Sequence, residues 1–336
     1  MNHAWRRAVA PLVGLLAGGS FLYFAFRTIS VETVAASLAG GHWFPAAPAI
    51  LLGVAVFIGA KARRWRTLLG DPADLPTATL ISPVAIGLLF NSLVPHSGEL
   101  ARAVTLQRSQ GLAVSGVLMG IAVERLFDFL TVLVFGLVAG GYTEVPPGLV
   151  APLRLLGVLS LGLGSAVLMA LLMPGVLSRI VHRLTAWWPA RPRHWLQHQV
   201  AHALAGLKPL RAAHRLPQAF GWSAVQWASV VWCIYFCAAV PGFTLSTAMS
   251  ALVLIAIVVI FTLPNAPGYL GSTQVAFLAV LVPLGVGQEQ ALAASFVYTL
   301  LAVVPMMLAG AVALLLGGRR PTLRAAHGAS PPNTRG

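Results

Sequence analysis

The sequence predicts an all-α protein, a polytopic bundle of transmembrane helices. Of its 336 residues, 58% are hydrophobic and only 9% are charged, and the mean hydropathy is +0.83. A soluble domain of this length cannot bury so much apolar surface. Repeated apolar runs of about 17 residues or more match the length that a helix needs to cross about 30 Å of hydrocarbon.

Six apolar runs have the length of full spans, and the basic residues between them predict their sidedness. Lys and Arg cluster before the first run, after the second, throughout segment 174–218 and after the last, and few occur in the other loops. The positive-inside rule places these clusters in the cytoplasm. We therefore expect a bacterial inner-membrane protein with both termini cytoplasmic. The six runs are residues 10–27, 44–60, 112–140, 150–173, 219–241 and 290–316.

The basic cluster after the second run is part of this topology prediction. Its members directly follow the apolar residues, so we expect them in a cytoplasmic loop that ends the helix. They are Lys61, Arg63, Arg64 and Arg66.

Two other basic segments are expected at the cytoplasmic surface. Residues 174–218 contain no acid and carry three tryptophans beside their arginines, which is typical of an amphipathic element lying on anionic lipid. Residues 319–336 are rich in Arg, Pro, Gly and Ser and are expected to be a disordered tail. Residues 1–318 then form a single transmembrane domain. Because membrane topology accounts for the net charge of +14, we expect no nucleic-acid partner.

Two further apolar stretches are interrupted by proline and glycine. The charges at both ends of residues 79–110 place them on one side of the membrane, which favours a re-entrant hairpin. Residues 246–285 also return to their starting side, either as a second hairpin or as two full helices, which would give eight spans. Broken backbone at membrane depth survives where it is buried in protein or lines a wet cavity, and paired breaks are typical of transporters with inverted repeats. Ordinary loops are the alternative. The breaks are expected at Pro95, Gly98, Pro264, Pro267, Gly268 and Gly271.

Three charged residues fall near the middle of the span 112–140. They are Glu124, Arg125 and Asp128, and the whole chain contains only eight acids. Burying charge at this depth is costly, so we expect these side chains to be paired and to face a cavity or the bundle interior. They form either a polar site that handles a lipid head group or a proton, or an ion-pair network that fixes helix register.

Glu99 and Arg102 follow the first break, at the expected start of a half-helix. Free N–H groups at such a start favour an anion, unless Glu99 itself satisfies them. We predict that Arg102 and Arg125 hold a phosphate, or pair with the three acids when no lipid is present.

Neutral polar residues follow the second break. Asn265, Tyr269 and Gln274 either bind the rest of a head group or satisfy the backbone that the prolines leave unpaired.

Three short motifs occur in order between about residues 80 and 316. They are Asn91–Pro95 followed by Gly98–Arg102, then Val123–Asp128, then Leu263–Gln274. Together they resemble the P…GE…R, V-E-R-x-x-D and P-x-x-P-G-x-x-G patterns of the lysylphosphatidylglycerol synthase transmembrane-region family, which are flippase-like membrane proteins. The resemblance implies a domain that moves an amphipathic lipid between leaflets. In some members this is aminoacylated phosphatidylglycerol. The short Pro95–Gly98 spacing, and Gln274 where many members have Glu, depart from the pattern.

The resemblance favours a flippase over an enzyme. The sequence has no G-x-S-x-G, Walker A, H-E-x-x-H or Asp-rich motif, and we expect no metal or cofactor. The soluble aminoacyl-transferase domain of bifunctional members is missing, so we do not expect lysylphosphatidylglycerol synthesis. The expected substrate is a phospholipid, glycolipid or polyprenyl- or hopanoid-type lipid. The alternative is an accessory subunit or an enzyme of lipid-linked glycoconjugate or hopanoid synthesis, with a glycosyltransferase partner. Three G-x-x-x-G pairs allow close packing or a homodimer.

Overall fold

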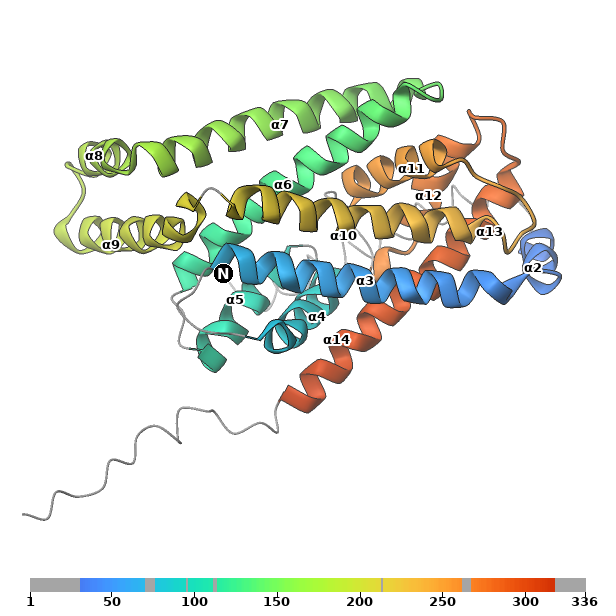
Figure 1. Cartoon of the computed structure of the whole chain (residues 1–336), viewed down its shortest axis with the longest axis horizontal. Helices are drawn as coiled ribbons and strands as arrows, with labels where there is room; N and C mark the ends of the chain where they lie inside the picture. The colour runs from blue at the N-terminus through green and yellow to red at the C-terminus, as the bar shows by residue number, and fades with distance from the viewer. Residues whose placement is uncertain are drawn as a thin grey trace, which may run out of the picture.

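A computed structural model gives the arrangement of the helices (Figure 1). The described residues form helices and connecting turns, with no strand among them, which confirms an all-α membrane bundle. The predicted span 10–27, the tail 319–336, Pro95, Pro264 and Asn265 lie outside the described residues. The structure describes residues 31–69, 76–94, 96–110, 114–212, 214–261 and 267–317.

Five long helical runs match the predicted spans that fall within the described residues. Four of the described helices are long and apolar enough to cross a membrane, and α6 is as long but carries three charged residues in its interior. The chain is therefore a multi-pass membrane protein. The runs are α3 (Trp43–Leu69), α6 (Val114–Gly140), α7 (Pro147–Leu172), α10 (Arg215–Cys237), and a continuous run of α13 (Gln288–Tyr298), the π-helical turn η3 (Thr299–Val303) and α14 (Val304–Gly317).

The first interrupted stretch folds as the expected helical hairpin. Helices α4 (Thr77–Leu93) and α5 (Ser97–Gln110) pack against each other, and both are shorter than a full span. The two helices are closest at Gly87 and Gly98, where a Cβ atom on Gly98 would overlap the Gly87 carbonyl oxygen. Glycine at this position is thus required for the return of the chain.

The second interrupted stretch also consists of short helices. Helix α11 (Thr247–Ile260) has 14 residues and α12 (Ser272–Leu281) has 10, so neither reaches the roughly 20 residues of a full crossing. This favours the hairpin over two full spans. Between them lies the turn η2 (Pro267–Tyr269), and Gly268 and Gly271 adopt left-handed φ angles of 72° and 81°.

The order of elements repeats along the chain. A long helix, a broken hairpin and a second long helix occur first as α3 to α6 and again as α10 to α14. Helices α3 and α10 begin the two halves and lie side by side (Figure 1). They run antiparallel, since Cys233 contacts Ile50 whereas the earlier Ser223 contacts the later Arg64. This order and orientation agree with the possible inverted repeat.

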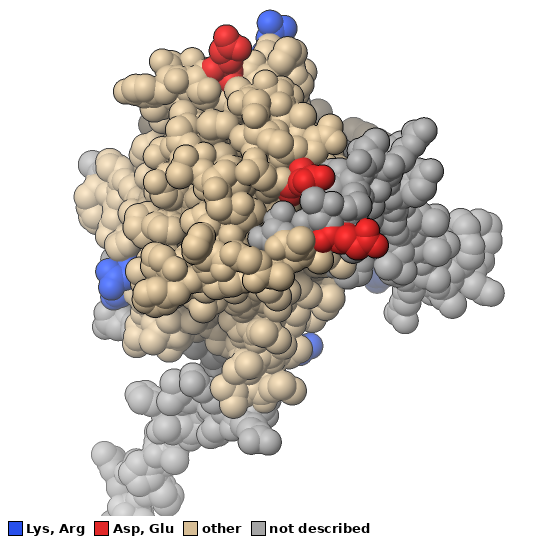
Figure 2. Space-filling model, turned by 90° about the vertical axis from the view of Figure 1, so that its right-hand side faces the viewer, with Lys and Arg blue, Asp and Glu red and all other residues tan. Residues whose placement is uncertain are grey.

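The predicted surface segment forms two helices and a short turn. Helices α8 (Pro174–Leu184) and α9 (Ala190–Gly206) and the turn η1 (Lys208–Arg211) lie at one end of the bundle, away from α2 (Val31–Ala39) and the α6–α7 turn (Figure 1). Figure 2 views the α2 end, whose described surface carries only scattered charged groups. The basic helices therefore lie away from the predicted external loops.

The interpretation of residues 61–66 as a loop cluster is wrong. Helix α3 continues to Leu69, and the Arg64 side chain is 0% exposed. Lys61 is also largely buried, whereas Arg63 and Arg66 are exposed. Hydropathy alone predicts that a helix ends at its first charged residues, because it contains no information about distant acids that pair with those residues.

A layer of polar side chains lies close to the boundary between two apolar clusters. On α3, Phe57 belongs to one cluster and Trp65 to the other. On α6, Val132 and Phe127 belong to the same two clusters, and on α10 both clusters are again represented. Polar side chains near this boundary are at matching heights on three helices, because Arg64 of α3 bonds Asp128 of α6 and Ser223 of α10. This layer contains Lys61, Arg64, Glu124, Asp128, Ser223, Gln226 and Trp227.

Candidate functional site

Glu124 is the centre of the polar layer. Its side chain is 2% exposed, and its Oε1 accepts hydrogen bonds from Lys61 and, at 2.8 Å, from Arg64 Nη2. Arg102 Nη2 donates to Oε2 at 2.5 Å. One carboxylate of α6 thus binds cations from both α3 and α5. The Arg102 guanidinium also stacks over the Trp65 ring, with 3.9 Å to the centroid.

Asp128 lies one helical turn further along α6 and connects the layer to α10. Its Oδ1 accepts from Arg64 Nη1 and from Trp227 Nε1, both at 2.7 Å. Arg64 Nη1 also donates to Ser223 Oγ at 2.8 Å. Arg64 therefore bridges two acids on α6 and a hydroxyl on α10, which fixes the register of three helices.

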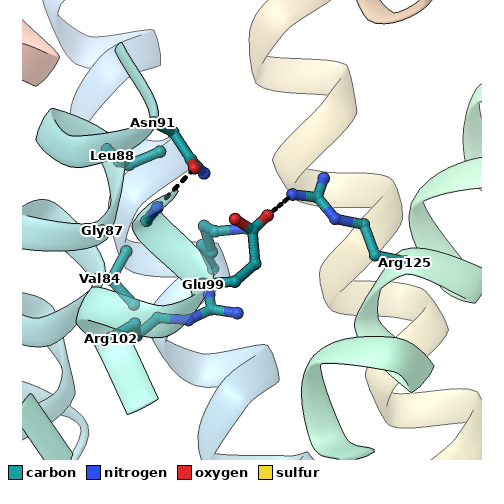
Figure 3. Close-up of a pocket in the computed structure, with 9 residues that line it drawn as sticks. Val84, Gly87, Leu88, Asn91, Glu99, Arg102 and Arg125 are labelled. Atoms are coloured by element: carbon teal, nitrogen blue, oxygen red, sulfur yellow. Dashed lines mark hydrogen bonds and ion pairs between the residues drawn. The ribbon is translucent and has the colours of Figure 1, made fainter. Parts of the chain in front are cut away.

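Arg125 lies beside the polar layer and is more accessible than the charged side chains within it. It forms an ion pair with Glu99 of α5, and its other nearby carboxylate, Asp128 Oδ2, is 3.9 Å from Nη1. The Arg125 side chain is 40% exposed and that of Glu99 is 16% exposed. Figure 3 shows the Glu99 and Arg125 side chains pointing toward one another from different helices. This pair joins the first hairpin to α6 at the edge of the layer.

These contacts define one group, which we call the charge network. It has four cations and three carboxylates, and a continuous set of ion pairs joins them. The expected pairing of Arg102 and Arg125 with the three acids is present in the structure. The members are Lys61, Arg64, Glu99, Arg102, Glu124, Arg125 and Asp128.

A cavity of about 220 Å³ opens on the network. Its polar wall includes Lys61, Arg125 and Asp128, and both hairpins border it, through Asn91 of α4 and through Tyr269. The rest of the lining is mainly apolar. The apolar part comes from Phe57, Leu88, Phe129, Val230, Ile257, Val258, Phe261, Val303 and Met306, and Ser92, His96, Gln226, Trp227 and Tyr298 complete the lining.

A second, much smaller pocket of about 20 Å³ lies between α4, α5 and α6 (Figure 3). It has room for about one water molecule. Lys61 and Arg125 line both spaces, and Arg102 and Glu99 line only the small one. The two cations therefore stand at the boundary between the large cavity and the more deeply buried part of the network.

Of the residues predicted at the second break, Tyr269 and Gln274 are within the described residues. Tyr269 lines the large cavity, stacks on Phe261 with 3.8 Å between ring centroids, and donates from its hydroxyl to the Asn91 carbonyl oxygen at 3.1 Å. This bond ties the two hairpins together.

Gln274 is buried away from the described lining of the cavity. Its Oε1 accepts from the Gly271 N–H at 2.8 Å, and its Nε2 lies 3.5 Å from Thr299 Oγ1. The geometry thus favours the backbone role, since Gln274 satisfies a free donor at the start of α12.

The sequence did not identify four polar side chains at this site. Lys61 and Arg64 resembled a loop cluster, and Gln226 and Trp227 are isolated within an apolar run. For Lys61 and Arg64 the available signal was their i, i+3 spacing on one face of a helix, but that face is buried because α6 supplies acids that pair with it. Gln226 is buried and lines the cavity, and its Oε1 has no hydrogen-bond partner.

The fold and the site define a class: a polytopic helical membrane protein with a charged cavity between two broken hairpins. Among the described residues, no three His, Cys, Asp or Glu side chains are grouped as a metal site requires. Residues 11–310 match the family model described as "Lysylphosphatidylglycerol synthase TM region". The chain therefore belongs to this family, as its motifs indicated. No curated protein and no solved structure matches it.

Proposed function

We propose that this protein moves an amphipathic lipid between the leaflets of the bacterial inner membrane. The observation that carries the proposal is the large cavity, because a buried charge network forms its polar wall and both broken hairpins border it. Charged groups buried in a membrane protein are costly and mark substrate or ion pathways. Family membership supports a role in lipid modification or flipping.

The size of the cavity suits a lipid head group. Its volume of about 220 Å³ is roughly ten times that of the small pocket of about 20 Å³, which has room for about one water. A phospholipid, glycolipid, polyprenyl-linked or hopanoid-type lipid would place its polar end here and leave its tails in the apolar surroundings. The substrate is therefore held by its head group, and the apolar lining faces the start of its chain.

The charged residues have distinct roles in this proposal. Arg125, which is partly exposed, is the first cation to meet a phosphate, and the phosphate competes with Glu99 for it. Arg102 lies deeper, stacked on Trp65 and bound to Glu124. The acids keep these cations paired when the cavity holds no lipid. Tyr269 and, as an untested prediction, Asn265 contact the remainder of the head group.

The membrane orientation is part of the same proposal. The basic helices α8 and α9 lie on the anionic head groups of the inner leaflet, and both termini are cytoplasmic.

Leaflet-resolved translocation in reconstituted vesicles tests this function. The probe is fluorescent phosphatidylglycerol in phosphatidylcholine vesicles, and a membrane-impermeant quencher reports the fraction in the outer leaflet. We expect the wild type to translocate the probe much faster than empty vesicles do. Arg125→Gln should slow translocation at least tenfold, which corresponds to about 1.4 kcal/mol.

Two controls keep the result specific. Arg66→Gln removes an exposed arginine from α3, outside the charge network, and should leave the rate unchanged. The double variant E99Q/R125Q removes both partners of one ion pair, so it leaves no carboxylate unpaired, and it should also be slow. A wild-type rate equal to that of empty vesicles would overturn the proposal. Conversion of the probe to a new product would instead indicate an enzyme.

A further inference from the structure

The charge network does not balance. Four cations and three carboxylates make up the network, so its formal charge is net positive. The lining of the large cavity has the same sign, since Lys61 and Arg125 face one acid, Asp128. The lining of the small pocket is more positive still, because its charged residues are Lys61, Arg102, Arg125 and a single acid, Glu99.

The excess positive charge is located where a ligand can reach it. Arg64 is 0% exposed and forms ion pairs with both Glu124 and Asp128 through its two terminal nitrogens. Lys61, Arg64 and Arg102 all pair with Glu124, so one carboxylate faces three cations. Lys61 and Arg125 are also the two cations that border both the cavity and the small pocket. A negative group at this boundary would therefore meet two cations that the three acids do not fully neutralise.

Two unpaired polar atoms belong to residues that line the small pocket. Arg102 is almost fully buried and its Nε has no acceptor, and Glu99 Oε2 has no donor. The buried donor of a cation without an acceptor is unfavourable, and an anionic oxygen satisfies it at low cost.

From this imbalance we infer that the site selects lipids whose head group is net negative and discriminates against aminoacylated, net positive ones. The inference rests on the proposed function and names the substrate class for it. A cationic head group would add positive charge to a buried site that already has an excess, where low dielectric strengthens the repulsion. A phosphodiester with a neutral polar group, such as glycerol or a sugar, would balance the network instead.

The test compares three lipids in one vesicle system. The probes are phosphatidylglycerol (net negative), phosphatidylcholine (neutral) and lysylphosphatidylglycerol (net positive), all with the same fluorescent acyl chain. Binding of each lipid to the purified protein is measured in parallel by native mass spectrometry. The inference predicts that the negative probe is bound and moved at least tenfold better than the positive one.

Variants separate charge selection from a purely structural effect. Glu99→Gln adds one positive charge to the network and should raise the preference for the negative probe. Arg125→Gln removes one and should lower the ratio of negative to neutral probe toward unity. The pair variant E99Q/R125Q leaves the net charge as in the wild type, so it should keep the preference even where it slows movement. A structural role alone would change rates and leave these ratios constant.

The possible outcomes distinguish the two proposals. Equal or better movement of the positive probe refutes the inference and leaves lipid translocation standing. Movement of no probe refutes the proposed function. In that case the binding ratios still decide the inference, which equal binding of the three lipids would overturn.

Discussion

Neutralising Glu124 should be among the most damaging single changes to a charged residue of this protein. Glu124→Gln keeps the shape of the side chain but removes the carboxylate that pairs with Lys61 and Arg102, and leaves Arg64 with Asp128 alone. Removing one partner of a buried ion pair costs about 3–5 kcal/mol. Because three cations lose this partner, we expect the upper end, about 5 kcal/mol. At roughly 2 °C per kcal/mol for a chain of this size, the midpoint of thermal unfolding falls by about 10 °C.

The measurement is thermal unfolding of purified protein in lipid nanodiscs. Glu144→Gln is the matched control, because Glu144 is exposed in the α6–α7 turn, and it should change the midpoint little. The double variant K61M/E124Q removes one of the stranded cations with the acid and should regain part of the loss. Equal midpoints for E124Q and E144Q would refute the account of Glu124 as the ionised centre of the network.

Two further variants test the hairpins by the same unfolding measurement. Gly98→Ala places a methyl group against the carbonyl of the facing helix and should cost about 1–3 kcal/mol, whereas Gly148→Ala, with open space around it, should not; equal losses would contradict the close approach. Gln274→Ala leaves the buried Gly271 N–H without its acceptor and should cost about 1–3 kcal/mol, against little for the exposed Gln288→Ala. An unchanged midpoint for the Gln274 variant would mean that its side chain is not needed to hold the break.

The sequence was most informative where a local property decides the structure. Apolar length predicted the long helices. Pro and Gly predicted the second break, where Gly268 and Gly271 adopt left-handed angles. At the first break Gly98 lies inside α5, so it serves the close approach of the two helices rather than the break itself. The depth of the α6 charges predicted that they are paired; Glu124 and Asp128 are buried, whereas Arg125 is paired but 40% exposed. These predictions need no knowledge of any other part of the chain.

The partners of those charges were less predictable. Arg64 and Lys61 lie about sixty residues before Glu124, and nothing local to α3 distinguishes a buried arginine from one in a cytoplasmic loop. For Gln274 the error runs the other way: the sequence suggests a ligand-binding residue, because it is a polar residue next to a break. The structure shows instead that its side chain accepts a hydrogen bond from the Gly271 N–H. Long-range pairing, which the packing of α3, α5 and α6 determines, therefore decides which polar residues form the site.

The central claim is that the charge network and its cavity hold the head group of an anionic lipid. The most direct measurement is mass spectrometry of the lipids retained when the protein is extracted in native nanodiscs, compared with the lipids of the surrounding membrane. The account predicts that an anionic lipid is enriched with the wild type and with Arg66→Gln, and that Arg125→Gln loses this enrichment. Retained lipids with the composition of the bulk membrane in all three proteins would contradict it.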